Sequence, residues 1–473
     1  MEQIFEEQNF SEDKLHEECG VFGIFSHNED VALNTYWGLY ALQHRGQEST
    51  GIVVTDGERM KIKKGMGLVA DLQGYAAIGH VRYSTTGASM PYNIQPLKVY
   101  FDGGNLALSH NGNLTNAGQL RANLAKEGAV FNTTVDSEVV LNLIAYSARP
   151  TIEERVAEAV NQIKGAFAIL LLTDNKIIAV RDPYGFRPLV LGKMENGWCV
   201  ASESCAFDLV GAELVRDVKP GEMIIIDSDN SEPRSMMWAE NKPAKPAHCI
   251  FEYVYFARND SIIDNQSVYD ARIQMGRELA KETPDIHPDI VISVPDSGTP
   301  AAIGYAMEAG VPFLEGLTKN RYVGRTFIQP TQKQRANAVR LKLNPVRSVV
   351  EGKSVVMVDD SIVRGTTSGK IVKLLKEAGA REVHVCISSP PVTDSCYYGI
   401  DTSERKELIA ARCTENEICR YIGADSLHYI SLDGMKRAID KIDPDGLCCA
   451  CFSAKYPDNA DSVIKAEPES IIE

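Results

Sequence analysis

The chain has 473 residues, 44% of them apolar, so it can bury enough surface for two domains. Its formal net charge of −15 at pH 7 opposes non-specific binding to nucleic acid. Its longest uncharged apolar run, residues 165–172, is too short to cross a bilayer, so we expect neither nucleic acid nor a membrane as a partner.

The first 18 residues differ in composition from the rest of the chain. They contain six Glu and one Asp against one Lys, which gives a formal charge of −6. They have neither the basic start nor the apolar stretch of a secretory signal, so we predict a cytoplasmic protein. The segment could be a frayed acidic terminus. Alternatively, it is a propeptide whose removal makes Cys19 the first residue, so that its α-amino group can act as a base for the thiol.

Cys19 stands at the head of an apolar segment, residues 19–25, that predicts a strand. A cysteine in such a place is more often a core residue than a nucleophile. Three later segments reverse that preference, because each combines polar side chains with a glycine, where backbone can approach a ligand closely. These segments are residues 43–49 (QHRGQES), 79–87 (GHVRYSTTG) and 109–113 (SHNGN).

Together, the three segments and Cys19 resemble the class II glutamine amidotransferases, a family of N-terminal-nucleophile hydrolases, over about residues 19–240. The resemblance implies an αββα sandwich in which the thiol of Cys19 attacks the side-chain amide of glutamine. It places the oxyanion hole at Asn111 and the amide of Gly112. The glutamine-binding residues that it implies are Arg82 for the α-carboxylate, Asp136 for the ammonium group, and Arg45 and Thr85 within the matching motifs.

The pattern of strands and amphipathic helices breaks at residues 241–246 (NKPAKP), where we place a linker because the segment has no apolar face. Strand and helix then alternate. Residues 290–294 (IVISV) predict a buried strand, residues 295–300 (PDSGTP) a tight turn, and a helix follows from residue 301.

The most informative stretch is residues 355–368 (VVMVDDSIVRGTTS). Its four apolar residues predict a strand covered on both faces, and its last four residues predict a helix N-terminus whose free amides can bind a phosphate. Between them, Asp359 and Asp360 can accept hydrogen bonds from ribose hydroxyls or hold a Mg²⁺ that bridges to pyrophosphate. The stretch therefore predicts a site for a phosphorylated sugar that carries pyrophosphate.

Residues 355–368 resemble the phosphoribosyl pyrophosphate signature of the type I phosphoribosyltransferases. The resemblance implies an α/β domain over residues 249–455 and one Mg²⁺ per subunit, held by Ser297, Asp359 and Asp360. The basic segment 319–347 contains no acidic residue; it is either a solvated loop or, as the resemblance implies, a lid over pyrophosphate. The implied contacts to the sugar pyrophosphate are Asp359, Asp360, Gly365, Thr366, Thr367, Ser368, Arg340 and Lys342.

The chain has eleven cysteines, most of which we interpret as small core residues or inert thiols. Residues 448–451 (CCAC) contain a CxxC, which by itself suits zinc, an iron–sulfur cluster or redox chemistry. Resemblance to glutamine amidotransferases of the iron–sulfur type implies one 4Fe-4S cluster per subunit, held by Cys249, Cys396, Cys448 and Cys451. Cys449 departs from the pattern, and whether it can replace one of these ligands is open.

Taken whole, residues 19 to about 456 resemble the glutamine phosphoribosylpyrophosphate amidotransferases of the iron–sulfur type. This family uses ammonia from glutamine to displace pyrophosphate from C1 of phosphoribosyl pyrophosphate, which gives 5-phosphoribosylamine, glutamate and pyrophosphate in the first step of purine synthesis. The resemblance implies a homotetramer that purine nucleotides inhibit. We thus expect a propeptide (1–18), an amidotransferase domain (19–240), a phosphoribosyltransferase domain (249–455) and a frayed tail (456–473).

Two rival functions fit parts of the sequence. Another class II amidotransferase would share the N-terminal motifs but would carry a sugar isomerase domain in place of residues 355–368. A transcriptional regulator built on a phosphoribosyltransferase fold would need a basic face and no nucleophile at Cys19. The sequence opposes both.

Overall fold

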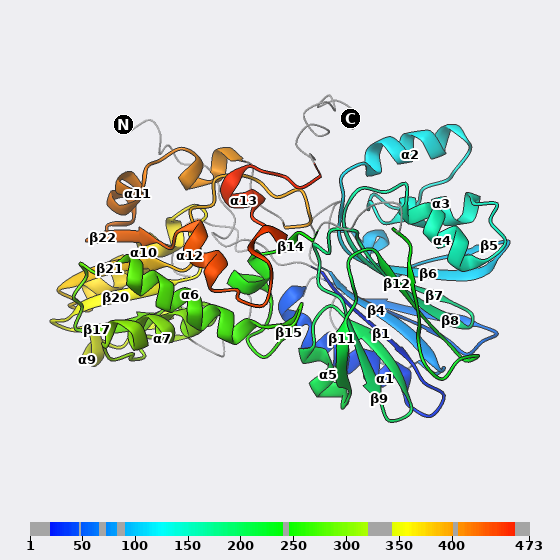
Figure 1. Ribbon diagram of the computed structural model, residues 1–473, viewed down its shortest axis with the longest axis horizontal. Coiled ribbons are helices and arrows are strands. Elements are labelled where there is room, and N and C mark those ends of the chain that lie inside the picture. Colours follow the sequence, from blue (N-terminus) through cyan, green and yellow to red (C-terminus); the bar gives the residue numbers. More distant parts are fainter. Residues whose placement is uncertain are drawn as a thin grey trace.

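The computed structural model describes residues 19–46, 49–65, 72–82, 90–239, 246–319, 343–400 and 405–458. These residues form two halves (Figure 1), an antiparallel one with two facing sheets and a parallel one with a single four-stranded sheet. Within the described ranges, no helix is long and apolar enough to cross a membrane.

The first half contains two antiparallel sheets in the strand orders β11-β9-β10-β1-β4-β2-β3 and β13-β12-β8-β7-β6-β5. The first sheet consists of β1 (Gly20–Phe25), β2 (Ser49–Thr55), β3 (Met60–Gly65), β4 (Ala76–Arg82), β9 (Val190–Met194), β10 (Gly197–Ala201) and β11 (Glu213–Asp217). The second consists of β5 (Leu97–Phe101), β6 (Gly104–Leu114), β7 (Gly165–Thr173), β8 (Lys176–Arg181), β12 (Glu222–Asp227) and β13 (Arg234–Met237).

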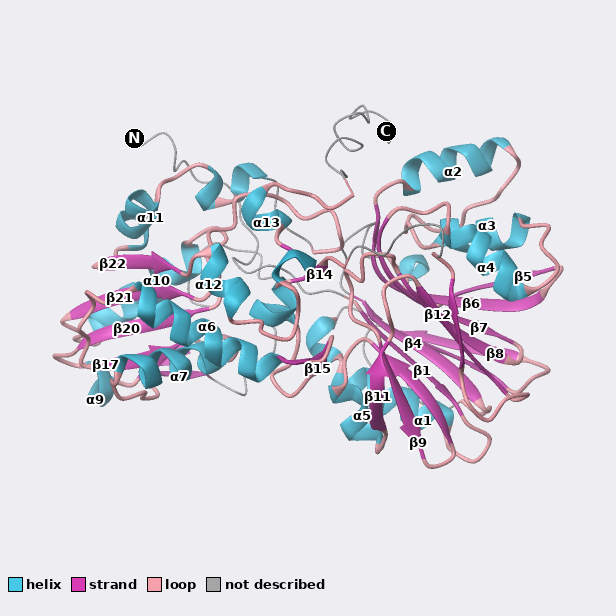
Figure 2. Ribbon diagram, viewed as in Figure 1, coloured by secondary structure: helices cyan, strands magenta, loops and turns pink. Residues whose placement is uncertain are grey.

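Helices cover the outer face of each sheet, so the strands lie between helical layers (Figure 2). The helices are α1 (Val31–Ala41) and α5 (Cys205–Val210) on the first sheet, and α2 (Ala117–Lys126), α3 (Glu138–Tyr146) and α4 (Ile152–Val160) on the side of the second. Strands covered on both faces read as continuous apolar runs, and β7 is buried at eight of its nine positions for this reason. This is the predicted αββα arrangement.

The second half is built on the parallel sheet β17-β20-β21-β22. Its strands are β17 (Ile290–Ser293), β20 (Ser354–Asp359), β21 (Glu382–Ile387) and β22 (Ser426–Tyr429), and its main helices are α6 (Val268–Glu282), α7 (Gly298–Ala309), α10 (Thr366–Glu377), α11 (Glu415–Ile422) and α12 (Leu432–Arg437). Helices α6 and α7 cross closely, because a Cβ on Gly276 would lie 1.9 Å from the carbonyl oxygen of Ala301. Parallel strands end at one edge of the sheet, and that edge is where α/β folds bind ligands.

Short elements complete the chain. The 3₁₀ turns are η2 (Gln43–Arg45), η3 (Pro91–Asn93), η5 (Arg405–Glu407), η6 (Ile409–Ala411) and η7 (Pro444–Gly446), and η4 (Glu252–Phe256) is a π-helix. The short α-helices are α9 (Arg347–Val350) and α13 (Ala450–Ser453). Three pairs of short strands are β14 (His248–Cys249) with β23 (Leu447–Cys448), β15 (Ile262–Ile263) with β16 (Gln266–Ser267), and β18 (Leu317–Lys319) with β19 (Leu343–Pro345). The β18–β19 pair joins the two ends of the predicted lid, whose inner residues lie outside the described ranges.

Candidate active sites

The predicted oxyanion turn lies near the end of β6. Asn111 is 1% exposed, and its side-chain nitrogen Nδ2 has no acceptor among the described residues. A buried donor without an acceptor is costly, so such a group is expected to have a functional role. Gly112 has φ +140°, and a Cβ there would lie 2.1 Å from the carbonyl oxygen of Ala166, so only glycine fits this turn.

Cys19 is buried directly before β1, where Arg45 holds its backbone. The Nε of Arg45 donates a 3.1 Å hydrogen bond to the carbonyl oxygen of Cys19. The guanidinium also contacts Glu203 of the first half at 2.5 Å and Glu252 of the second half at 2.7 and 3.0 Å. Its described contacts therefore anchor the candidate nucleophile to both halves; the predicted contact of Arg45 with glutamine stays a prediction.

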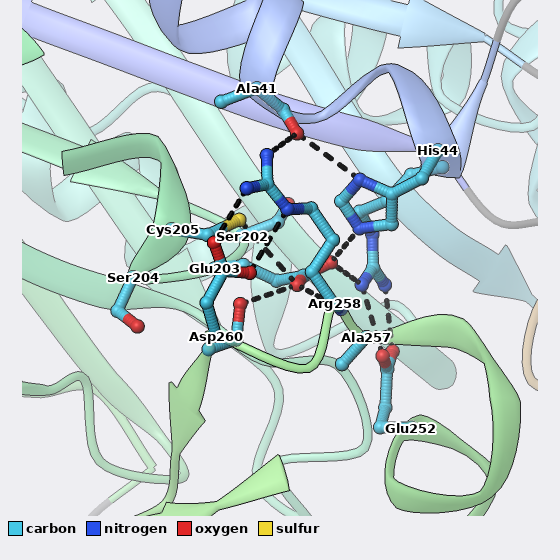
Figure 3. Close-up of polar contacts among 12 residues, drawn as sticks. Ala41, His44, Ser202, Glu203, Ser204, Cys205, Glu252, Ala257, Arg258 and Asp260 are labelled. Atoms are coloured by element: carbon cyan, nitrogen blue, oxygen red, sulfur yellow. Dashed lines mark hydrogen bonds and ion pairs between the residues drawn. The ribbon is translucent and has the colours of Figure 1, made fainter. Parts of the chain in front are cut away.

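Glu203 is the centre of a buried polar cluster between the halves (Figure 3). Its carboxylate contacts Nε2 of His44 at 2.6 Å and accepts hydrogen bonds from the amide of Arg258 at 2.9 Å and the hydroxyl of Ser261 at 2.7 Å. Burial alone would raise the pKa of Glu203, but His44 and Arg45 outweigh it and hold the pKa well below its usual value. Glu203 therefore stays ionised at neutral pH.

The predicted glutamine-binding residues lie on elements that meet β6. Arg82 is 3% exposed at the end of β4, and Nε2 of His80 on the same strand lies 3.1 Å from the carbonyl oxygen of His110. Oδ2 of Asp136 accepts a 2.8 Å hydrogen bond from the amide of Leu114. Burial opposes ionisation of Asp136, yet His110 and its other partners hold its pKa below the usual value. Thr85 lies outside the described residues.

The sequence did not reveal two further polar side chains around the oxyanion turn. Oε1 of Gln95 accepts a hydrogen bond from the amide of His110 at 2.8 Å, and the hydroxyl of Ser137 lies 3.0 Å from Nδ1 of His110. Gln95 thus fixes the backbone of His110, the residue before Asn111, and Ser137 fixes the ring of His110. Gln95 and Ser137 lie 15 and 27 residues from His110 in the sequence, so no local pattern indicates these contacts.

The paired carboxylates of the second half lie at the carboxyl edge of the parallel sheet. Asp359 and Asp360 are 2% and 1% exposed, and the hydroxyl of Ser297 donates to Oδ2 of Asp360. The amide of Val294 donates to the carbonyl oxygen of Val358 at 2.8 Å, which holds the turn after β17 against the end of β20. The structure thus brings Ser297 into contact with Asp360, next to Asp359, and the binding of Mg²⁺ by these three residues stays a prediction.

The predicted phosphate turn begins α10. Gly365 caps the helix with φ +80°, and Thr366, Thr367 and Ser368 form its first turn, where amides lack partners within the helix. Arg340 and Lys342 lie outside the described residues, so their predicted contacts stay predictions.

Arg272 of α6 is a buried cation near this site that the sequence did not reveal. Its Nε donates to the carbonyl oxygen of Tyr253 at 2.8 Å, and its Nη2 donates to that of Ala257 at 2.8 Å. Burial lowers the pKa of Arg272 to about 10, against the attraction of Asp360. Arg272 therefore joins the segment that contains Glu252 to the neighbourhood of the sugar site.

The four predicted cluster cysteines lie on segments that hydrogen-bond to one another. Cys249 pairs with Cys448 in the parallel β14–β23 register, and the carbonyl oxygen of Cys451 accepts from the amides of residues 393 and 394 at 3.0 and 3.1 Å, just before Cys396. Burial raises the pKa of Cys249 to about 12. Burial and the neighbouring thiols also raise the pKa values of Cys448 and Cys451. For Cys449, burial raises the pKa to about 11, against a lowering by Lys436.

A site for a single metal ion has a different geometry from a site for a four-iron cluster. Across the described ranges, no group of three or more His, Cys, Asp or Glu side chains is arranged to hold a single metal ion. A four-iron cluster holds its thiolates farther apart than one ion does, because the sulfurs bind different iron atoms. The donor set, four largely buried thiols that influence one another, fits such a cluster chemically.

Comparisons with known proteins agree with this division into halves. Residues 80–208 match the family described as glutamine amidotransferase domain, and residues 259–415 match phosphoribosyl transferase domain. Over 97% of its length the chain is 48% identical to a Bacillus subtilis (strain 168) protein named amidophosphoribosyltransferase, of which it covers 98%. It is 49% identical over 94% of its length to amidophosphoribosyltransferase 1, chloroplastic, of Arabidopsis thaliana, of which it covers 80%.

Solved structures show the same likeness. The glutamine phosphoribosylpyrophosphate amidotransferase from B. subtilis complexed with ADP and GMP matches with a TM-score of 0.86 and 48% identity, covering 93% of this chain and 97% of that chain. A structure described as the allosteric regulatory enzyme of purine biosynthesis matches with a TM-score of 0.87 and 49% identity, covering 93% and 96%. These matches confirm the predicted fold classes of both halves.

The polar cluster predicts a pH-dependent loss of stability in Glu203→Gln. Breaking a buried ion pair costs about 3–5 kcal/mol, so we expect that loss at pH 7. Because the folded pKa of Glu203 is depressed, its contribution is complete above the unfolded value of 4.5 and is lost as pH falls below it. In urea unfolding, the stability gap between wild type and variant should therefore be constant from pH 7 to about pH 5 and narrow by about 1.4 kcal/mol by pH 3.5. Glu213→Gln, at an exposed position, is the control; a constant gap at all pH values would contradict the assignment.

Proposed function

Because the chain belongs to the amidophosphoribosyltransferase family, we propose that its two halves divide one reaction, with glutamine hydrolysed at Cys19 and the ammonia used at the Asp359–Asp360 site. The chain is a glutamine amidotransferase and glycosyltransferase of purine biosynthesis. The observation that supports the division is the presence on one chain of two different structural features, a buried amide donor without an acceptor among the described residues at Asn111 and a glycine-capped helix start at Gly365.

In the first half, the thiolate of Cys19 attacks the side-chain amide carbon of glutamine. The oxyanion that forms accepts hydrogen bonds from Nδ2 of Asn111 and the amide of Gly112. Its collapse breaks the C–N bond, the α-amino group of Cys19 returns the thiol proton to the leaving nitrogen, and ammonia departs from a thioester on Cys19. Water then hydrolyses the thioester to glutamate. Arg82 is assigned to the α-carboxylate of glutamine and Asp136 to its ammonium group, together with Thr85. The buried contacts of Arg45 support a positioning role through the carbonyl oxygen of Cys19.

In the second half, ammonia attacks C1 of phosphoribosyl pyrophosphate, and pyrophosphate leaves with the electrons of the C1–O bond. The first turn of α10 is assigned to the 5-phosphate, and Asp359 and Asp360 to the ribose hydroxyls. Ser297, Asp359 and Asp360 would hold one Mg²⁺, which when bound neutralises charge on the pyrophosphate. Arg340 and Lys342 are assigned to the pyrophosphate as part of a lid.

Further properties of the family extend the proposal. A 4Fe-4S cluster on Cys249, Cys396, Cys448 and Cys451 would tie the chain segments that already hydrogen-bond there. Because a similar structure holds ADP and GMP, we also expect purine nucleotides to bind and inhibit this protein in the cytoplasm.

A homotetramer is the assembly that we propose. Helix α1 contains no charged residue, and its outward residues Leu33, Trp37 and Tyr40 are 38–48% exposed. A helix of this composition is expected to be covered, so its outer face supports self-association.

The propeptide proposal predicts that active protein begins at Cys19. The α-amino group can serve as base only when no residue precedes it, so a variant that retains residues 1–18 should lack glutamine hydrolysis. Intact-mass measurement combined with a glutaminase assay tests this. Full glutaminase activity in protein that still carries the leader would refute it.

The division of labour predicts opposite effects of two kinds of variant. Cys19→Ala should lower glutamine-dependent synthesis by more than about 10³-fold and leave synthesis from added ammonia unchanged. Asp359→Asn and Asp360→Asn should lower both syntheses by about 10²-fold while the Cys19 thiol still reacts with an alkylating glutamine analogue. Phosphoribosylamine formation is measured with each nitrogen donor at saturating Mg²⁺. Loss of the ammonia reaction in folded Cys19→Ala would be incompatible with two separate sites.

The cluster proposal predicts brown protein after anaerobic purification, with about four iron and four sulfide per chain. Serine in place of Cys249, Cys396, Cys448 or Cys451 should remove the iron and lower the thermal midpoint. Cys413→Ser, at a half-buried position away from this set, is the control, and Cys449→Ser tests whether Cys449 is dispensable. Colourless protein with one zinc per chain would rule the cluster out.

A further inference from the structure

Residues 396–399 of the second half lie directly against the oxyanion turn of the first half. A Cβ on Gly399 would come within 3.0 Å of the carbonyl carbon of Gly112 and within 3.1 Å of its Cα, so the two backbones are packed together without side chains between them. Nδ2 of Asn113 donates a 3.0 Å hydrogen bond to the carbonyl oxygen of Tyr397. These contacts join residues that are 284 or more positions apart in sequence.

Gly112 is also confined by its own sheet, since it pairs with Phe167 of β7 and a Cβ on it would meet the carbonyl oxygen of Ala166 at 2.1 Å. Its φ of +140° is open to glycine and strained for other residues. The backbone of Gly112 is therefore confined from two sides, by β7 and by Gly399.

The segment that carries Gly399 is firmly held. Nε and Nη2 of the fully buried Arg187 both donate to the carbonyl oxygen of Tyr398, at 2.9 and 2.7 Å. The ring of Tyr398 stacks on Phe186, with centroids 4.1 Å apart and planes 16° apart. The amide of Tyr398 donates to the sulfur of Cys396 at 3.3 Å. Because Arg187 and Phe186 belong to the first half, the segment cannot shift without breaking buried contacts.

We propose that Gly399 is a positioning residue for the oxyanion hole, acting through the backbone of Gly112. An oxyanion donor works only when its hydrogen-bond distance to the developing charge is about 2.7–3.1 Å, and a displacement of about 1 Å can cost about 10²-fold in rate. Glutamine hydrolysis in the first half thus depends on a residue of the second half. The inference rests on the proposed role of Asn111 and Gly112.

The test is Gly399→Ala, whose added methyl has to push the Gly112 backbone aside. The variant should lower kcat for glutamine hydrolysis by about 10²-fold and change KM for glutamine by less than about threefold, because the substrate-binding side chains are untouched. Its affinity for a glutamate γ-aldehyde, which forms a tetrahedral adduct on Cys19, should fall in parallel with kcat. Alkylation of Cys19 by iodoacetamide and synthesis from ammonia should stay at wild-type rates.

Backbone strain is separated from the contact by a matched control. Gly128 has φ +96°, close to the +104° of Gly399, and a Cβ on it would meet nothing within 4 Å among the described residues. Gly128→Ala should therefore keep full glutaminase activity. A second variant, Asn113→Ala, removes the bond to Tyr397 without adding atoms and should lower kcat less than Gly399→Ala does.

Three results would overturn the inference: wild-type hydrolysis in Gly399→Ala, equal loss in Gly128→Ala, or a fall of ammonia-dependent synthesis and thermal midpoint together with hydrolysis in Gly399→Ala. Failure of the proposed function itself has a different signature. It would appear in wild type as absent glutamine hydrolysis, or as Cys19→Ala that still uses glutamine.

Discussion

The buried ion pairs of Arg45 with Glu203 and Glu252 are the constraint on which both halves depend. A buried guanidinium costs several kcal/mol to desolvate, and here carboxylates from both halves compensate for that cost. The same side chain holds the carbonyl oxygen of Cys19. Separating the halves would therefore leave a buried charge without its partners and would release the backbone of the nucleophile, so the glutaminase half is complete only as part of the whole chain.

The two sites solve different electrostatic problems with similar backbone geometry. In the proposed reaction, Gly112 lies in a turn that only glycine fits and presents its amide to a charge that exists only during the reaction, so its position has to be exact to a fraction of an ångström. At Gly365, a left-handed cap begins a helix whose amides, in the proposed role, bind a phosphate that is charged throughout. The turn at Gly112 is accordingly confined by Ala166 and Gly399 on neighbouring segments, whereas the 12-residue helix α10 sets the geometry of the turn at Gly365.

The sequence predicted local features well and long-range partners poorly. Continuous apolar runs and the stretch 355–368 predicted buried strands and a helix start, because burial and helix starts leave patterns within a few residues. The two fold classes were implied by resemblance to known families. Glu203, Glu252, Arg272 and Gly399 were not predicted as site residues. Their roles depend on tertiary packing, which produces no periodic pattern in the sequence. Arg45 and Glu203, for example, lie 158 residues apart. The cluster ligands were proposed only by resemblance, since four thiols suit zinc equally well.

The position of the cysteines suggests why a metal group would matter for an enzyme that has no use for redox chemistry. Cys249 and Cys448 join the first strand after the interdomain linker to a strand near the end of the described chain. Cys396 comes directly before the segment that packs on Gly112. If the proposed cluster ties these segments together, its loss loosens the contact with the oxyanion turn sooner than it disturbs the parallel sheet, whose strands contain none of the four proposed cluster ligands. Glutamine hydrolysis would then be more sensitive to the metal than synthesis from ammonia, because only the former needs a donor whose position is set across the junction.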